Sequence, residues 1–515
     1  MAAFAKIATE CLDDPLMWLF FASVAALVIL QRRRPGNPPL PPGPRKLPII
    51  GNMLIADQLT HRGLAALAKK YGGLLHLSLG RLHLFAVSTP EYARAVLQAQ
   101  DGDFANRPAS MAVHYLTYGC SDMAFSPNGH YWRQMRKLCA TRLFSRRRPE
   151  TWLAVRDGYG ALARAVAGRS GEAVNLGELV FSHTVRVIFR AAFGIRGEGG
   201  EGLDEFVPIF GELSKLFQVF HIGEFFPWLS WVNRRGVDGR IRSTRSALGE
   251  FLDRIIDEHV RKGKNPDDAD ADMVDGLLAF LADAEKPSGE DDLSFTRDNI
   301  KAMMMDMLFG GPDTVGFTIE WAMAEMIRSP HVLLRLQREL ADVVGLDRRV
   351  AESDLDKLPF LRCVVKETLR MHPPIPLQLH GTIKDCVVGG YSVPSGSRVF
   401  INAWAINRDP ESWKDGDTFR PSRFMPGEGE AADLDLRGSC YEFIPFGSGR
   451  RACPAQGLGQ HAVEFAIAQL SHGFDWELPD GMSPSKLDMD DKFGVSISRA
   501  KRLCVVPTRR FTCPY

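Results

Sequence analysis

The chain has 515 residues, of which 45% are hydrophobic and 24% charged, an ordinary globular composition. This composition excludes collagen-like, wholly disordered and multi-span membrane proteins. Lys and Arg number 63 against 62 Asp and Glu, so the net charge of +1 provides no field that would draw the whole chain onto nucleic acid. The nine cysteines are scattered and form no C-x-x-C pair, which indicates reduced thiols rather than a disulfide scaffold or a zinc ribbon.

An uninterrupted apolar run covers residues 16–30 and is followed by Arg32, Arg33 and Arg34. A secretory signal peptide carries its positive charge before the apolar stretch, so the order here is reversed. Positive flanking residues stay on the cytoplasmic side of a membrane. We therefore expect residues 1–34 to form a membrane anchor with a basic stop, residues 35–46 a stiff proline-rich hinge, and residues 47–515 a cytosolic folded domain.

The body of the chain predicts mainly helix with small β-sheets. Between residues 47 and 88, the β-rich stretches LLHLSLG and LHLFAVS accompany a helical stretch at 62–71. From residue 90 to 372 the apolar spacing is mostly helical, with breaks at 197–202 and 262–292. The second break is acidic, and we interpret it as a solvated surface segment. Strand-like pieces return at 383–400 and at the C-terminus.

Residues 197–202 (GEGGEG) satisfy the G-x-G-x-x-G pattern of dinucleotide-binding proteins. That pattern requires a preceding strand, whereas SHTVRVIFRAAFG before it predicts a helix, so we interpret the glycines as a loop. The chain also lacks the H-E-x-x-H, Walker A and G-x-S-x-G motifs. The corresponding metalloprotease, nucleotide and serine-hydrolase chemistries therefore have no basis in this sequence.

Residues 443–459 (FIPFGSGRRACPAQGLG) combine a glycine-rich loop, one cysteine and the beginning of a helical stretch. A thiol at a helix N-terminus is stabilised as the thiolate, which is the state that a soft metal ligand needs. Gly447 and Gly449 would let the backbone approach a flat cofactor. A buried structural cysteine remains the alternative reading of Cys453 from these residues alone.

The pattern F-x-x-G-x-R-x-C at Phe446, Gly449, Arg451 and Cys453 resembles the haem-binding loop of the cytochrome P-450 monooxygenases. Three further motifs follow the order of that family: WRQMR, KETLR and FRPSRF. The resemblance implies the cytochrome P-450 fold, with haem b buried between a central distal helix and the helix after the cysteine loop. It implies Cys453 as the axial ligand of the haem iron, and as further cofactor-binding residues Trp132, Arg136, His380, Phe446 and Arg451, with ordinary packing an equal alternative for His380.

The family resemblance also assigns roles on the helices. Glu367, Arg370 and Arg423 would form a structural ion-pair cluster. Residues 303–321 resemble the central distal helix, in which Asp313 and Thr314 would relay protons to dioxygen; a back-bonded threonine and a solvated aspartate are the alternative. Pro312 and Ala455 depart from the usual residues of the family. The substrate-pocket candidates, any of which could instead be core, are Leu308, Phe309, Ile375, Leu377, Val495 and Ile497.

Three segments resemble those of plant endoplasmic-reticulum members of this family that hydroxylate the 5-position of ferulate and coniferaldehyde. Their sequences are SDMAFSPNGHYWRQMRKLC, EWAMAEMIRSP and LPDGMSPSKLDM. This relationship implies hydroxylation of a small phenolic ring with O2 in phenylpropanoid (syringyl lignin) biosynthesis. Electrons would come from NADPH through a separate reductase, and the basic stretch from Arg133 to Arg148 could dock that partner. Aryl hydroxylases of flavonoids or coumaroyl esters, a reductase-independent haem-thiolate isomerase or dehydratase, and a non-catalytic haem protein remain alternatives.

Overall fold

The computed structural model describes residues 23, 38–145, 149–195, 202–233, 236–265, 268, 270–284 and 295–510. Apart from Ser23, the expected anchor lies outside these residues, as do residues 35–37 of the expected hinge and Arg146–Arg148 of the basic stretch. Within the part of the chain that is described, no helix combines the length and the apolar character needed to cross a membrane.

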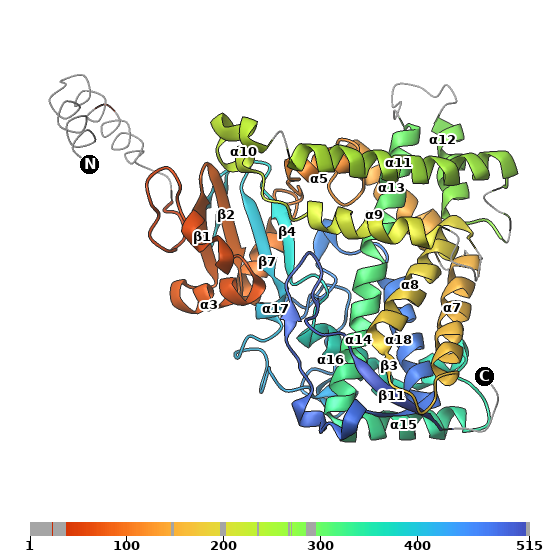
Figure 1. Ribbon diagram of the computed structural model, residues 1–515. Coiled ribbons are helices and arrows are strands. Elements are labelled where there is room, and N and C mark those ends of the chain that lie inside the picture. The colour runs from red at the N-terminus through yellow and green to blue at the C-terminus, as the bar shows by residue number, and fades with distance from the viewer. Residues whose placement is uncertain are drawn as a thin grey trace, which may run out of the picture.

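A four-stranded sheet forms a lobe at one side of the molecule (Figure 1). Its order is β1 (Leu74–Leu79), β2 (Leu82–Val87), β7 (Arg398–Asn402) and β4 (Leu377–Gly381). Strands β1 and β2 pair antiparallel, β2 and β7 parallel, and β7 and β4 antiparallel. The central pairing therefore joins the early strands to a segment more than 300 residues later. The two strands expected between residues 47 and 88 are both present.

Smaller sheets complete the β structure. The second sheet has the order β3 (Val174–Asn175), β11 (Cys504–Arg509) and β8 (Phe474–Glu477). Two hairpin-like pairs join β5 (Cys386–Val388) to β6 (Tyr391–Val393) and β9 (Asp491–Lys492) to β10 (Ser498–Arg499). The strand-like pieces expected at 383–400 and at the C-terminus are thus confirmed.

Helices make up the larger part of the molecule (Figure 1). The described α-helices are α3 (His61–Tyr71), α4 (Pro90–Arg94), α5 (Met111–Leu116), α6 (His130–Leu138), α7 (Pro149–Ala167), α8 (Leu176–Phe193), α9 (Leu203–Leu216), α10 (Ile222–Phe225), α11 (Val237–Lys262), α12 (Met273–Ala284), α13 (Arg297–Gly310), α14 (Pro312–Arg328), α15 (Pro330–Val344), α16 (Pro359–Met371), α17 (Ala403–Ile406) and α18 (Gln456–Gly473). Helix α14 is buried on nearly every side and packs against α8, α16 and α18, as expected of a central core helix.

The expected single helix over residues 303–321 is divided into α13 and α14 at Gly311. The backbone there stays close to helical, with φ −90° and ψ −58°, and the Gly311 N–H still donates to the carbonyl of Met307. Pro312 occupies the first turn of α14, where its missing N–H costs least. A Cβ on Gly311 would lie 2.7 Å from Cδ1 of Ile188, so the glycine also lets α8 approach this junction.

The interpretation of residues 262–292 as a solvated segment is wrong for its central part. Helix α12 lies there, and Met273, Val274 and Leu277 are buried against the main core. The acidic residues are used locally: Asp272 accepts hydrogen bonds from the backbone of Val274 and Asp275 and caps the helix. His259 of α11 lies 2.7 Å from Asp272, so these charges are internal to the fold.

Candidate active site

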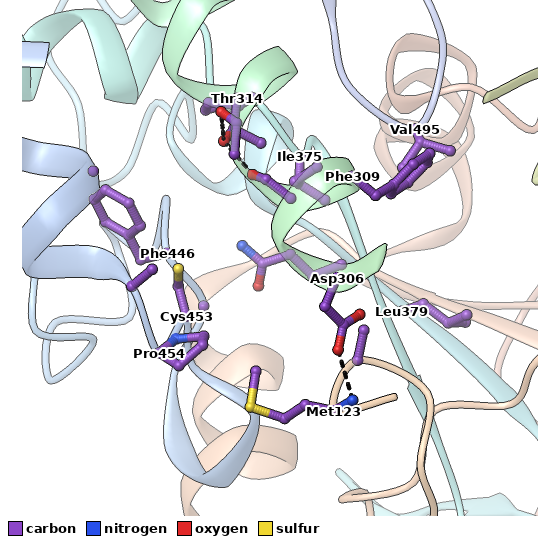
Figure 2. A pocket seen from close by; sticks show the side chains of 18 of the residues that line it. Met123, Asp306, Phe309, Thr314, Ile375, Leu379, Phe446, Cys453, Pro454 and Val495 are labelled. Carbon is purple, nitrogen blue, oxygen red and sulfur yellow. Dashed lines mark hydrogen bonds between the residues drawn. The ribbon is translucent and has the colours of Figure 1, made fainter. Parts of the chain in front are cut away.

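A cavity of about 730 Å³ lies between the α13–α14 pair and the loop that precedes α18. Figure 2 shows Cys453 and Phe446 on one side of the cavity, Phe309, Val495 and Leu379 on the opposite side, and Thr314 and Ile375 between them. Segments from both lobes contribute to the wall, because β4 and the residues before it face the central helices. The cavity is therefore built only when the sheet lobe and the helical body are assembled.

Cys453 reaches the cavity from a tightly held turn. Its N–H donates to the carbonyl of Phe446 over 2.9 Å, and Gly447 and Gly449 take positive φ values of 73° and 67°. At Gly449 a Cβ would also lie 2.5 Å from a carboxylate oxygen of Asp101. Both the positive φ and this close contact therefore require glycine at position 449. The turn fixes the thiol immediately before α18, as the sequence pattern predicts.

Burial raises the pKa of the Cys453 thiol, while the N–H of Ala455, Arg136 and Arg107 act against that effect. The residue before α18 is Ala455 itself, so the departure from the usual glycine leaves the helix start intact. The alanine contributes its backbone N–H to the sulfur, and this donation does not depend on the side chain.

Arg451 anchors the cysteine loop to the segment that precedes α6. Its Nε donates to the Ala105 carbonyl over 2.6 Å, and the other guanidinium nitrogens donate to the carbonyls of Met123 and Ser126. The guanidinium also lies 4.4 Å from the centroid of the Trp132 ring. Both residues of this pair line the cavity.

Three guanidinium groups gather at this end of the cavity: Arg107, Arg136 and Arg451. Burial, with Arg107 and Arg136 nearby, lowers the pKa of Arg451 to about 9, and burial also lowers the pKa of Arg107 and of Arg136. Such repulsion is relieved by a bound anion. The sequence interpretation missed Arg107, whose role is set by tertiary proximity, although it lies in the short polar stretch ANRP before α5.

His380 lines the same end of the cavity, but unlike the three arginines its side chain is neutral. Its Nδ1 donates to the Phe104 carbonyl over 3.2 Å, and burial, with Arg107 nearby, lowers its pKa to about 3. The neutral ring therefore presents Nε2 as an acceptor. A contact from His380 to a carboxylate requires reprotonation of that nitrogen, so its assignment stays a prediction.

The donor set fits a haem. A thiol at a helix start, a glycine-rich turn and three clustered guanidiniums match an iron ligand, a flat macrocycle and two carboxylates, respectively. Phe446 stands beside Cys453 on the same wall (Figure 2). All six residues predicted to bind the cofactor line this one cavity, namely Trp132, Arg136, His380, Phe446, Arg451 and Cys453.

Thr314 lines the cavity, whereas Asp313 does not. The Thr314 hydroxyl donates to the Gly310 carbonyl over 2.6 Å, which is the back-bonded arrangement that the sequence left as an alternative. Burial raises the pKa of Asp313 to about 6, with Arg502 acting against the rise. The two residues therefore stand on different sides of α14, and their joint relay role stays a prediction.

Four of the six predicted pocket residues line the cavity: Phe309, Ile375, Leu377 and Val495. The other two expectations are not met. Leu308 is 1% exposed within the main core, because the turn of α13 carries it away from the face that Phe309 occupies. Ile497 is buried against Phe317 and Trp321.

The predicted ion-pair cluster forms away from the cavity and is fully buried. The Glu367 carboxylate receives two hydrogen bonds from Arg370, at 2.8 and 2.9 Å, and one from Arg423 at 3.0 Å. Arg370 also donates to the carbonyls of Asn407 and Gly416. This arrangement joins α16 to the loops before α18, so its contribution is to the fold.

The fold, the cysteine loop and the haem-compatible cavity define a haem-thiolate oxygenase, and a family model described as Cytochrome P450 matches residues 41–504. The chain belongs to the cytochrome P450 family and is a monooxygenase of that family. It is 53% identical to "Cytochrome P450 84A1" of Arabidopsis thaliana, with 98% of each chain covered. It is 39% identical to a "Flavonoid 3'-monooxygenase" of the same plant, with 93% of each covered.

Among solved structures, a zebrafish cytochrome P450 with progesterone superposes with a TM-score of 0.75 at 26% identity. The match covers 87% of this chain and 99% of the zebrafish chain. The predicted fold class, mainly helical with small sheets, and the predicted resemblance to plant members of the family are confirmed.

Proposed function

We propose that this chain is an NADPH-dependent, O2-activating monooxygenase that hydroxylates the aromatic 5-position of ferulate, coniferaldehyde or coniferyl alcohol in phenylpropanoid (syringyl lignin) biosynthesis. One observation carries the proposal: a single apolar cavity extends from Cys453 to Phe309, Ile375 and Val495. A haem held by Cys453 would take up part of this space, and the apolar residues at the other end would contact one small ring. Phe309, stacked on Phe217 with centroids 4.2 Å apart, provides a flat aromatic wall for it.

When bound, a haem ligated by Cys453 supplies the oxygen-activating iron chemistry of the family. Arg136, Arg451 and Trp132 would hold the carboxylate groups of the cofactor. Thr314 Oγ1 keeps its lone pairs while it donates to Gly310, so it can accept a hydrogen bond within the cavity. Rotation of the hydroxyl group about its Cβ–Oγ1 bond would free its proton from the Gly310 carbonyl. Burial raises the pKa of Asp313 to about 6, so a fraction of this carboxyl group stays protonated close to neutral pH and would supply the next proton.

The proposal extends to the cellular setting. Residues 1–34 anchor the protein in the endoplasmic-reticulum membrane, residues 35–46 form the hinge, and residues 47–515 are the haem-thiolate domain on the cytosolic side. A separate NADPH–cytochrome reductase supplies electrons. Arg136 lines the cavity and so is not part of the docking face, which leaves the exposed Arg133, Lys137 and Arg142 for this role among the described residues.

A flavonoid hydroxylase is the second candidate, since one of the relatives bears that name at 39% identity. An isomerase or dehydratase that needs no external electrons is disfavoured, because a hydroxyl suited to proton delivery, that of Thr314, faces the cavity. Strict dependence on NADPH separates this class from the first two.

Membranes that contain the full chain and a plant reductase test the proposal. Coniferaldehyde, ferulate, a coumaroyl ester and a flavanone are offered in parallel, with and without NADPH, and Cys453→Ala is the matched control. NADPH-dependent 5-hydroxyconiferaldehyde supports the proposal. Turnover of the ester or flavanone alone, by haem-loaded enzyme, overturns the substrate and keeps the monooxygenase class.

A further inference from the structure

The backbone of Met123 is the point at which three parts of the site meet. Its N–H donates to a carboxyl oxygen of Asp306 on α13 over 2.7 Å, the contact drawn in Figure 2. Its carbonyl accepts hydrogen bonds from Arg451 and from Trp132 Nε1, each at 3.2 Å. One residue therefore links the distal helix to α6 and to the cysteine loop by main-chain groups alone.

Asp306 does not act by itself. Its carboxyl group lies beside that of Asp122, close enough for the protonation of each to affect the other. Asp122 is 0% exposed and accepts from the Phe125 N–H over 3.0 Å. Two neighbouring carboxyl groups that are buried together do not readily ionise at the same time, so the pair retains a proton. The two carboxyl groups thus hold the N–H groups of Met123 and Phe125 on the same loop.

The surroundings favour the shared proton. Burial, followed by the neighbouring Asp122, raises the pKa of Asp306 well above its ordinary value, and burial raises that of Asp122 to about 6. Charged and titratable groups face the pair from every packed segment: Arg107 before α5, Cys120 on the same loop, Tyr131 of α6, Cys139 after α6, and Arg451 of the cysteine loop. Arg107 acts to lower the pKa of Asp122 but is itself buried, and the pKa of Asp122 stays raised.

A second contact from α13 holds the same loop two turns earlier. Asn299 donates to the Tyr131 hydroxyl over 2.9 Å, and that hydroxyl donates to the Ser121 carbonyl. Asn299 and Asp306 are seven residues apart and so share one face of the helix. Only the Asp306 contact continues through Met123 to Arg451.

We propose that Asp306 is a positioning residue: paired with the Asp122 carboxyl group, it fixes the Met123 peptide and thereby holds Arg451 and Trp132 in place at the cofactor end of the cavity. This inference goes beyond the proposed function, because it is the same whichever ring the enzyme hydroxylates. The role of Asp306 can therefore be disproved while the substrate assignment stands, and the substrate assignment can be disproved while the role of Asp306 stands.

Two substitutions at Asp306 distinguish the effect of its ionisation from the effect of its contacts with Met123 and Asp122. Asp306→Asn keeps both contacts, since its amide oxygen accepts from Met123 and its NH2 donates to Asp122, but it cannot ionise. Asp306→Ala removes both contacts. Asp298→Asn is the matched control, because Asp298 lies on the same helix, is exposed and forms only a surface pair with Lys301.

The first readout is haem loss from the purified, haem-loaded full chain to excess apomyoglobin. Asp306→Asn and Asp298→Asn should match the wild type, whereas Asp306→Ala should lose haem about 10- to 100-fold faster. If Asp306→Ala loses haem no faster than Asp298→Asn, or if Asp306→Asn is as damaging as Asp306→Ala, the proposal is wrong.

The second readout is the thermal unfolding midpoint between pH 5 and 9, which needs only the wild type and Asp306→Asn. Because the pKa of Asp306 is raised in the folded state, its stabilisation is present at low pH and lost as pH rises toward that value. The wild type should lose stability relative to Asp306→Asn as pH increases. Parallel curves would contradict the proposal even if Asp306→Ala does not fold.

Discussion

Arg451 and Trp132 come from segments more than 300 residues apart, yet the guanidinium lies 4.4 Å from the indole centroid and both groups donate to the carbonyl of Met123. The planar fork of arginine makes this possible, since its three nitrogens donate to three carbonyls while its face stacks on the ring. Protein contacts alone thus hold both side chains at the cofactor end of the cavity.

Replacement of Arg451 by lysine should lower the haem content of the purified protein, although the charge is kept. Lysine provides one point charge in place of the fork and cannot reach the carbonyls of Ala105, Met123 and Ser126 together. The ratio of haem absorbance to protein measures the effect. Arg450→Lys is the control, because its neighbour Arg450 is exposed and pairs with Asp101. Equal haem content in the two variants would contradict the account.

Thr314→Ala should lower product formed per NADPH consumed by about 10-fold or more and release the difference as peroxide. The methyl group of alanine cannot hold or deliver a proton in the cavity. Thr314→Ser, which keeps the hydroxyl, should retain most of the coupling. If the alanine variant stays fully coupled, Thr314 has no part in proton delivery.

Asp313→Asn should change how stability depends on pH. The pKa of Asp313 is raised to about 6 in the folded state by burial, so its stabilisation is present below its ordinary pKa near 4 and is lost as pH rises through 6. Between pH 4 and pH 7 the wild type should lose more stability than Asp313→Asn, measured as unfolding free energy in urea. A constant difference between the two proteins would show that Asp313 titrates normally.

The neighbours Leu308 and Phe309 should respond oppositely to truncation. Leu308→Ala removes a core side chain and should cost about 2–5 kcal/mol in the free energy of unfolding. Phe309→Ala should weaken substrate binding, seen in the spectral titration of the haem, because it removes the flat wall stacked on Phe217. Weakened binding in Leu308→Ala alone would place the cavity on the wrong face of α13.

Short sequence patterns were sufficient to predict the geometry of a site whose residues lie close together in the chain. The turn before Cys453 and the i, i+3 pair Glu367–Arg370 are encoded by residues close in the chain, and both take the expected geometry. The sequence did not predict in the same way which side chains of α13 face the cavity. Leu308 and Phe309 are adjacent and both apolar, and only the packing of α8 and α9 against α13 decides which one reaches the cavity.

Contacts between distant segments could not be predicted from the sequence, because they form only when the tertiary structure brings those segments together. Asp306 resembles any helical aspartate until the loop that carries Asp122 is folded against it, and Arg107 carries no motif of its own. The acidic stretch before Met273 indicated a solvated surface because charges usually face water. Asp272 instead caps α12 and contacts His259, so its environment is set by tertiary structure.

Oxygen labelling tests the central claim most directly. The full chain in membranes with a plant reductase, NADPH, coniferaldehyde and ¹⁸O2 should give 5-hydroxyconiferaldehyde that carries one labelled oxygen atom, and none without NADPH. Product labelled from water, product formed without NADPH, or no hydroxylation of coniferaldehyde, ferulate or coniferyl alcohol by enzyme that shows the thiolate band of its reduced carbon monoxide complex would contradict the account.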